Sequence, residues 1–173
     1  IFLKLVEQAD VVLENFRPGV MKRLGLDFET LKARNPKLVY CAISGFGQEG
    51  PWAKRPAYDQ IIQGLSGAMS VTGTSETGPL RAGFPLADMI AGLNAAMAIL
   101  AGLAGDPRQR EARFIDVSLL DCTLASMGWA VTSYLNAGIV PEPRGNENTS
   151  AAPSGAFRAA DGLINISANE QEQ

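Results

Sequence analysis

The sequence contains no histidine, the residue that most often serves as a general base near neutral pH and as a metal ligand. Serine–histidine and cysteine–histidine catalytic pairs are therefore excluded within this chain. The two cysteines, Cys41 and Cys122, lie in separate apolar runs without CxxC spacing, which favours buried free thiols over a disulfide, a zinc site or a redox pair. We expect a cytoplasmic protein without a metal, whose chemistry rests on carboxylates, hydroxyls, amides, lysines or arginines.

The chain also lacks a large excess of charge of one sign, since the net charge is −3 and no long run of like charges occurs. This pattern argues against a protein that binds nucleic acid or a membrane surface through its total charge. The charges are unevenly distributed. Residues 17–55 hold eight basic and three acidic side chains, a net of +5, whereas the rest of the chain holds seven basic and fifteen acidic ones, a net of −8. The first of these stretches is suited to meet an anion.

A start methionine, a helix cap and a signal-like basic segment are lacking at residues 1–6, which resemble the tail of an apolar-faced helix. A new helix is predicted to open at residues 170–173. We therefore expect a fragment of a longer protein, inactive on its own. With 173 residues, 46% of them hydrophobic, the chain is still able to bury one sizeable core.

The N-terminal part of the chain predicts a βαβ unit. Short apolar runs at residues 9–14 and 38–44 are typical of buried parallel strands. Between them, helices are predicted at residues 20–24 and 27–34, the second capped by Asp27. Because parallel strands point the same way, the loops that follow them should meet at one edge of the sheet, where ligands bind in open α/β sheets.

Residues 86–103 form an apolar stretch that is long enough for a transmembrane helix. Asp88, Asn94 and the many Gly and Ala residues favour instead a helix packed closely inside a globular core. We expect a brief strand at residues 113–116, followed by a second long, mostly buried helix at residues 117–135.

The remainder of the chain predicts a change of domain. Residues 141–154 are rich in Pro, Asn, Gly and Ser, which is typical of a linker. Two strands are predicted to follow, at residues 155–158 and 163–167, around an Asp-Gly turn. We therefore expect residues 1–140 to be part of one α/β domain and residues 155–173 to begin a smaller second domain.

Two loops could bind a ligand. In ENFRPGV, residues 14–20, the asparagine and arginine could hold a phosphate where a helix opens, although an ordinary solvated basic turn has the same pattern. The long loop SGFGQEGPWAKRPAYDQ, residues 44–60, could stack Trp52 or Tyr58 on a planar ligand. The same rings could instead anchor the loop to the core.

Asp88 is the third candidate. It lies in GPLRAGFPLADM, in the first turn of the apolar helix, where an acidic residue is most often a cap or a partner of the helix dipole. The alternative is a carboxylate nucleophile, half-buried and kept ionised by the helix N-terminus and nearby amides. Asp116 and Asp121, in RFIDVSLLD, are expected to be structural.

Five ordered blocks together resemble the class III CoA-transferases, a family that includes formyl-CoA transferase, carnitine CoA-transferase and the α-methylacyl-CoA racemases. The blocks are ADVVLENFRPGV, LGLDFETLKARNPKLVY, ISGFGQEGPWAKRPAYDQIIQGLSG, PLADMIAGLNAAMAILAGL and FIDVSLLD. The resemblance covers almost the whole chain, and five blocks in order are far more specific than any one motif. It implies an α/β fold, with a Rossmann-like large domain of parallel strands, the start of a smaller second domain and an interlocked homodimer.

The resemblance also implies a site and a reaction. The catalytic aspartate of the family falls on Asp88, which would carry an acyl group between an acyl-CoA and a carboxylic acid through an aspartyl anhydride and an aspartyl-CoA thioester. Coenzyme A, as a substrate, would be bound by Asn15, Phe16, Arg17, Arg23, Arg55, Pro56, Ala57 and Tyr58.

The related racemases pair their aspartate with a histidine, and Tyr58 stands at the matching position. A phenol with an unperturbed pKa near ~10 is a poor base at pH 7, which favours the transferase over the racemase. A non-catalytic acyl-CoA-binding module is a further alternative, and the intact Asp88 argues against it. The acyl donor and the acceptor stay open.

Overall fold

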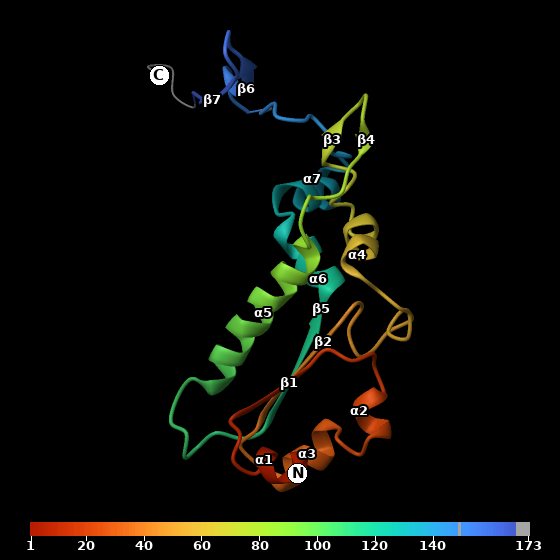
Figure 1. Cartoon of the computed structure of the whole chain (residues 1–173), viewed down its shortest axis with the longest axis vertical. Helices are drawn as coiled ribbons and strands as arrows, with labels where there is room; N and C mark the ends of the chain where they lie inside the picture. The colour runs from red at the N-terminus through yellow and green to blue at the C-terminus, as the bar shows by residue number, and fades with distance from the viewer. Residues whose placement is uncertain (149, 169–173) are drawn as a thin grey trace.

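The computed structural model describes residues 1–148 and 150–168, which are built around a three-stranded parallel sheet (Figure 1). The strands are β1 (Val11–Glu14), β2 (Val39–Ser44) and β5 (Arg113–Ser118), in the order β1-β2-β5. The two strands of the predicted βαβ unit are thus confirmed. β5 is longer than the brief strand expected and joins the same sheet, where it covers the free edge of β2.

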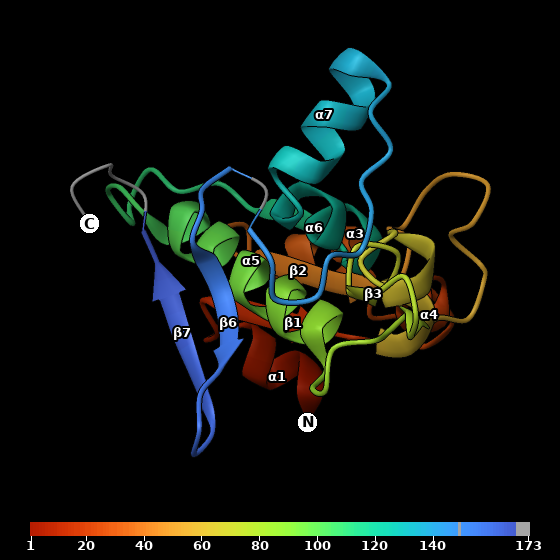
Figure 2. The same cartoon turned by 90° about the horizontal axis from the view of Figure 1, so that it is seen from above.

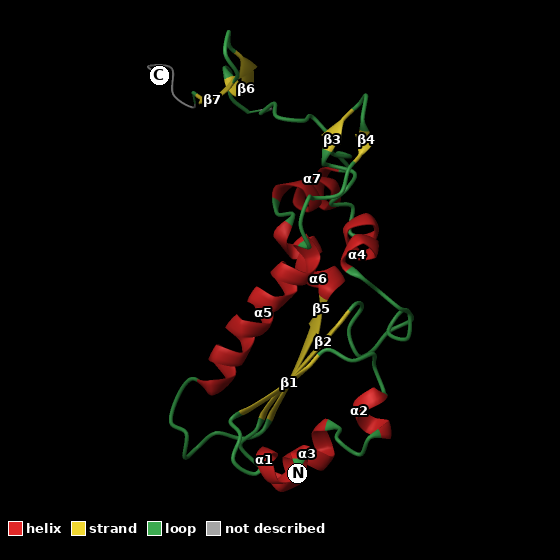
Figure 3. Ribbon diagram, viewed as in Figure 1, coloured by secondary structure: helices red, strands yellow, loops and turns green. Residues whose placement is uncertain are grey.

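Helices cover both faces of this sheet (Figure 3). One face packs against α1 (Phe2–Val6), α2 (Val20–Arg23) and α3 (Phe28–Arg34), through a core of Val6, Val12, Met21, Leu31, Leu38, Tyr40 and Ala42. The other packs against α4 (Asp59–Leu65), α5 (Leu86–Leu103) and α6 (Leu119–Ser126), through a core of Cys41, Ile62, Ala87, Ala91, Ala95, Val117 and Leu119. Successive residues of β2 belong to opposite cores, as expected for a strand buried on both faces.

The predicted cap of α3 is confirmed. The Asp27 carboxylate accepts a hydrogen bond from the Thr30 amide at 3.1 Å, which satisfies a backbone donor that the first helical turn leaves free. Both short helices, α2 and α3, begin and end within one residue of the predicted bounds.

The apolar helix α5 has the predicted bounds, Leu86–Leu103, but only one of its faces is buried. Its small residues lie against the sheet, and a methyl group on Gly102 would come within 3.3 Å of the Val39 side chain. On the opposite face, 54–67% of each large side chain is exposed, namely of Met89, Leu93, Met97 and Leu100. By length and composition alone α5 could also span a membrane, but its small-residue face packs against β2 and β5.

The expected long helix at residues 117–135 is wrong. Val117 and Ser118 complete β5, and two helices follow, α6 (Leu119–Ser126) and α7 (Trp129–Ala137), which Gly128 separates at φ 51°. The Ser118 hydroxyl caps α6 by accepting a hydrogen bond from the Asp121 amide at 3.2 Å. The prediction failed at its start because short apolar runs do not by themselves distinguish a strand from a buried helix. The expectation of a mostly buried helix also failed, because α7 is largely exposed.

Two small hairpins lie beyond the sheet (Figure 1). β3 (Gly73–Thr74) pairs with β4 (Gly78–Pro79), which the sequence did not predict, and β6 (Ser154–Arg158) pairs with β7 (Leu163–Ser167), which it did. The second hairpin follows the predicted linker and stands apart from the three parallel strands (Figures 1 and 2). The helix predicted at residues 170–173 lies outside the described residues.

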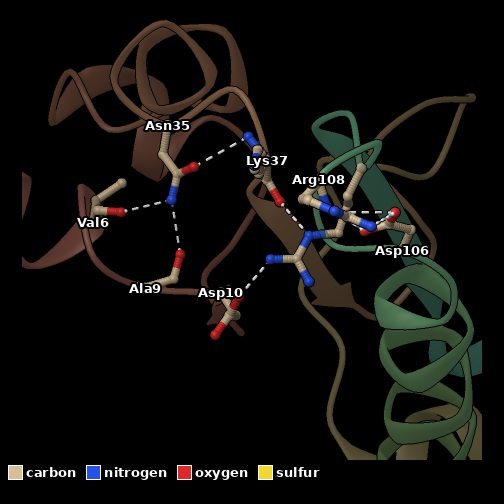
Figure 4. A network of polar contacts seen from close by, with 8 residues as sticks. Val6, Ala9, Asp10, Asn35, Lys37, Asp106 and Arg108 are labelled. Carbon is tan, nitrogen blue, oxygen red and sulfur yellow. Dashed lines mark hydrogen bonds and ion pairs between the residues drawn. The ribbon is translucent and has the colours of Figure 1, made fainter.

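Polar contacts tie together the segments that enter the three parallel strands (Figure 4). The Arg110 guanidinium, just before β5, forms an ion pair with Asp10, which precedes β1, and donates to the carbonyl oxygen of Lys37, which precedes β2, at 3.0 Å. Asn35 donates to the carbonyl oxygens of Val6 at 3.0 Å and Ala9 at 2.8 Å. These contacts fix the amino ends of the strands. The candidate site lies at the other end of the sheet, where the strands have their carboxyl ends.

Candidate active site

The carboxyl ends of β1 and β2 lie beside a pocket of about 270 Å³. It contains seven of the nine predicted site residues, since Arg23 and Pro56 are not part of its wall. The pocket is lined by Asn15, Phe16, Arg17, Pro18, Ser44, Gly45, Arg55, Ala57, Tyr58, Asp59, Asp88 and Leu119. Residues that are far apart in the sequence therefore converge at the edge of the sheet where a ligand was expected.

A larger hollow of about 1000 Å³ lies between α7, the loop that follows it and the β6–β7 hairpin. None of the predicted site residues lines it. The smaller pocket is the better candidate because two arginines, a tyrosine and two aspartates meet there.

The loop after β1 is held against the end of β2. The Asn15 side-chain amide donates to the carbonyl oxygen of Ile43 at 2.8 Å, and the Phe16 amide donates to the Glu14 carboxylate at 2.6 Å. Within the described residues Arg17 makes no ion pair, so its charge is available to a ligand at the pocket. The prediction that the loops after the two strands would be neighbours is confirmed.

Gly45 allows the segment that carries Arg55 and Tyr58 to approach β2. A Cβ atom on Gly45 would lie 2.2 Å from the Cβ of Ala57, a distance that no pair of side chains can adopt. Only glycine therefore fits while Ala57 forms the wall of the pocket.

The aromatic side chains of the long loop have different surroundings. The Trp52 ring meets the Phe46 ring edge-on at 5.5 Å and lies 4.8 Å below the Arg55 guanidinium, and Phe46 packs against the core next to α5. Trp52 therefore anchors the loop and orients Arg55, and the ring face below the Arg55 guanidinium is already occupied. Tyr58, at 72% exposure, lines the pocket.

The Asp88 carboxylate is exposed at the pocket and accepts no hydrogen bond within the part of the chain that the structure describes. The amides of Ala87 and Asp88 donate to the Asp59 carboxylate instead, at 2.8 and 3.3 Å. Two expectations about Asp88 are therefore wrong: it is not the cap of α5, and it is not a half-buried group held by helix amides. Asp59 is the cap, which leaves the Asp88 oxygens free for chemistry.

Gln63 holds Asp59 in place. This side chain is only 1% exposed, and its amide nitrogen donates to the second Asp59 oxygen at 2.6 Å. Its amide oxygen accepts from the Ala82 amide at 2.8 Å, which fixes the segment that leads into α5. Sequence reasoning missed both residues, although their spacing of four would have placed them on one face of a short helix after Tyr58.

The surroundings of Asp88 alter its acidity. Although the residue as a whole is exposed, partial desolvation of its carboxyl in the pocket raises the pKa above its usual value, and the nearby negative charge of Asp59 raises the pKa further. A carboxylate with a raised pKa is a stronger nucleophile when it is ionised.

Other acids near the pocket are structural. Asp116 accepts a hydrogen bond from the Gln48 amide at 2.8 Å and so holds the glycine-rich loop, as expected for a structural acid. Glu14 is buried at the end of β1, and burial raises the pKa of its carboxyl, against the opposing effect of its hydrogen bond with Phe16. Burial raises the pKa of the Tyr40 phenol strongly, and the negative charge of Glu14 raises it further.

The family model described as CoA-transferase family III matches residues 1–173. The chain belongs to CoA-transferase family III. It is 40% identical over 170 residues to the succinate–glutarate CoA-transferase of Agrobacterium fabrum, covering 98% of this chain and 42% of that protein. It is 43% identical over 162 residues to the acetyl-CoA:oxalate CoA-transferase of Acetobacter aceti, covering 93% of this chain and 42% of that protein.

A solved structure has the same fold as this family III chain. The CAIB/BAIF family protein from Brucella suis superposes with a TM-score of 0.89 at 39% identity, over 95% of this chain and 44% of that one. The mixed α/β architecture with a parallel sheet is therefore common to both. The chain spans less than half the length of these relatives.

Proposed function

We propose that the protein carrying this chain is a CoA-transferase that exchanges coenzyme A between an acyl-CoA thioester and a carboxylic acid, with Asp88 as its nucleophile. The observation that carries the proposal is the Asp88 carboxylate, which is free of hydrogen bonds within the described residues and shares a small pocket with two arginines and Tyr58. Membership of family III supports the same reaction.

The proposed reaction needs four displacements and no external base. Asp88 attacks the donor thioester carbonyl, the C–S bond breaks, and an acyl-aspartyl anhydride and the CoA thiolate form. The thiolate attacks the aspartyl carbonyl, releasing the donor acid as its carboxylate and leaving an aspartyl-CoA thioester. The acceptor carboxylate then attacks that thioester and frees the thiolate again. The thiolate finally attacks the acceptor's carbonyl, which regenerates Asp88, so no proton is gained or lost overall.

The basic residues at the pocket suit the anionic substrate. Arg17 has no ion pair in the described residues, and Arg55 is oriented by the Trp52 ring, so both charges can meet CoA phosphates. Backbone amides of the glycine-rich loop are the natural donors to the oxygen that becomes negative during each attack. The lack of histidine is compatible with this route, because carboxylate and thiolate act as the nucleophiles.

Small dicarboxylic acids are the first substrates to test, since the relatives from Agrobacterium fabrum and Acetobacter aceti are named for succinate, glutarate and oxalate. We also propose that the protein acts in the cytoplasm and that it is a homodimer. The exposed apolar face of α5 supports the homodimer.

The decisive experiment replaces Asp88 by Asn in the complete protein that carries this chain. We expect the variant to fold and bind CoA but to lose measurable acyl exchange, because the covalent route is removed. During turnover the unmodified protein should carry an adduct on Asp88 that hydroxylamine releases and peptide mass spectrometry detects. Substantial activity in Asp88→Asn, or an adduct on Asp116 or Asp121, would contradict the proposal.

A further inference from the structure

Two buried side-chain atoms in the described part of the chain have no hydrogen-bond partner, the Ser44 hydroxyl oxygen and the Gln48 amide nitrogen. Leaving a buried polar group unpaired destabilises a fold, so each such group in a native protein requires an explanation. Ser44 is the more informative of the two, because it alone lines the Asp88 pocket.

Ser44 is the last residue of β2 and is 5% exposed. Its partner across the ladder is Ser118, whose hydroxyl caps α6. The preceding carbonyl, of Ile43, accepts the Asn15 side chain. The neighbouring polar groups thus have partners within the protein, whereas the buried Ser44 hydroxyl has none, and Ser44 is one of the residues that line the pocket.

The size of the pocket limits what this hydroxyl can meet. A volume of about 270 Å³ lies below the range of about 300–1000 Å³ that holds a whole drug-sized ligand, so coenzyme A cannot be enclosed there entirely. The reacting end of an acyl-CoA does fit. Because Asp88 lies in the same wall and must touch the thioester carbonyl, Ser44 and Asp88 would face one small chemical group.

We propose that Ser44 is a further substrate-contacting residue, whose hydroxyl donates a hydrogen bond to an oxygen of the acyl thioester bound beside Asp88. This inference rests on the proposed transferase function. The carbonyl oxygen gains negative charge when the carboxylate attacks, so a fixed donor there strengthens as the bond forms. The unpaired hydroxyl of the free protein is then a group held ready for its ligand.

The test compares Ser44→Ala with Ser118→Ala in the complete protein. Ser44→Ala removes an unpaired group, so the Tm should stay or rise, while kcat/KM for acyl-CoA falls by about tenfold, the usual effect of one hydrogen bond. Ser118→Ala removes a cap, so the Tm should fall. A Ser44→Cys variant, of similar size but a weaker donor, should lie between the unmodified protein and Ser44→Ala.

Equilibrium binding in an Asp88→Asn background gives a readout that needs no turnover. We expect Ser44→Ala to weaken the binding of acetyl-CoA and succinyl-CoA and to leave the affinity for free CoA unchanged. Unchanged acyl-CoA binding and kcat/KM would overturn the proposal for Ser44, and so would an equal loss for free CoA. If the unmodified protein exchanges no acyl group but Ser44→Ala still selectively weakens acyl-CoA, the transferase function is wrong and the Ser44 contact stands.

Discussion

At the scale of single residues, Asp59 affects Asp88 through both geometry and charge. Asp59→Asn should keep the cap, because an amide oxygen still accepts from the amides of Ala87 and Asp88, but it removes the negative charge that raises the Asp88 pKa. Asp88 acts when ionised, so activity is lost as the pH falls through its pKa. The acid limb of the kcat/KM profile should therefore move to lower pH in Asp59→Asn. An unmoved limb, or one moved to higher pH, would refute the charge effect, and Asp121→Asn is the control.

Glu14 should make stability depend on pH. Folding raises the pKa of this carboxyl, chiefly through burial, so its contribution is fully present below the unfolded pKa and is lost as the pH rises through the folded one. Glu14→Gln imitates the protonated form and can still accept from the Phe16 amide. We expect its Tm to equal or exceed that of the unmodified protein at pH 7 and the difference to disappear in acid. Thermal unfolding of both proteins at several pH values measures this difference. The expectation would be contradicted if the Tm of Glu14→Gln, relative to that of the unmodified protein, were lower at pH 7 than in acid.

Arg17 and Arg108 form a matched pair of basic residues. Arg17 lines the pocket without an ion pair in the described residues, whereas Arg108 is bound to Asp106 at 2.9 Å in the turn after α5. Arg17→Ala should lower the affinity for CoA by roughly 10- to 100-fold, the usual effect of losing a charged hydrogen bond. Arg108→Ala should leave CoA affinity unchanged. Equal affinities of the two variants in a calorimetric titration would remove the role of charge at the pocket.

At the scale of elements, the contact between Gly45 and Ala57 sets the distance between β2 and the segment that carries Arg55 and Tyr58. Gly45→Ala must displace that segment, since its Cβ would lie 2.2 Å from the Ala57 Cβ, so KM for acyl-CoA should rise. The double variant with Ala57→Gly should recover much of the loss, because it removes the opposing methyl group. Gly92→Ala, on α5 with open space around it, is the neutral control. A double variant as impaired as Gly45→Ala would show that this contact does not shape the pocket.

Several elements could be predicted from the sequence because one local pattern decides each of them. The length of its apolar run predicted α5, and short apolar runs bounded by turn residues predicted the two strands that flank α2 and α3. The rule that the carboxyl ends of parallel strands meet predicted the convergence of Asn15, Arg17 and Arg55. The run after β5 is apolar at either period, so only packing decides where the strand ends. The cap by Asp59 and the unpaired Ser44 depend on which chemical groups meet in space, and no spacing in the sequence encodes this.

At the scale of the whole molecule, the surface is large for the mass. The accessible area is 11749 Å², whereas a compact monomer of 18.3 kDa is expected to expose about 8100 Å². Much of the excess is apolar, on the outer face of α5 and on α7, where Trp129 and Leu135 are more than 70% exposed. Such faces favour association.

We therefore expect the 173-residue chain, expressed alone, to associate in solution rather than remain a stable monomer. Light scattering after size-exclusion chromatography measures its mass, and thermal unfolding measures its cooperativity. A monodisperse monomer with a sharp transition would contradict this expectation. A variant with Leu93 and Met97 replaced by Gln should associate less, because it makes the outer face of α5 polar.

The contacts in Figure 4 have a consequence for engineering. The Arg110 side chain fastens the entrances to all three parallel strands, at the edge of the sheet opposite the Asp88 pocket. The chain's stability and its recognition of ligands are thereby assigned to opposite ends of the same strands. Libraries that randomise pocket positions such as Tyr58 can then explore new acyl groups without loosening the strand register, provided that Asp10 and Arg110 are kept.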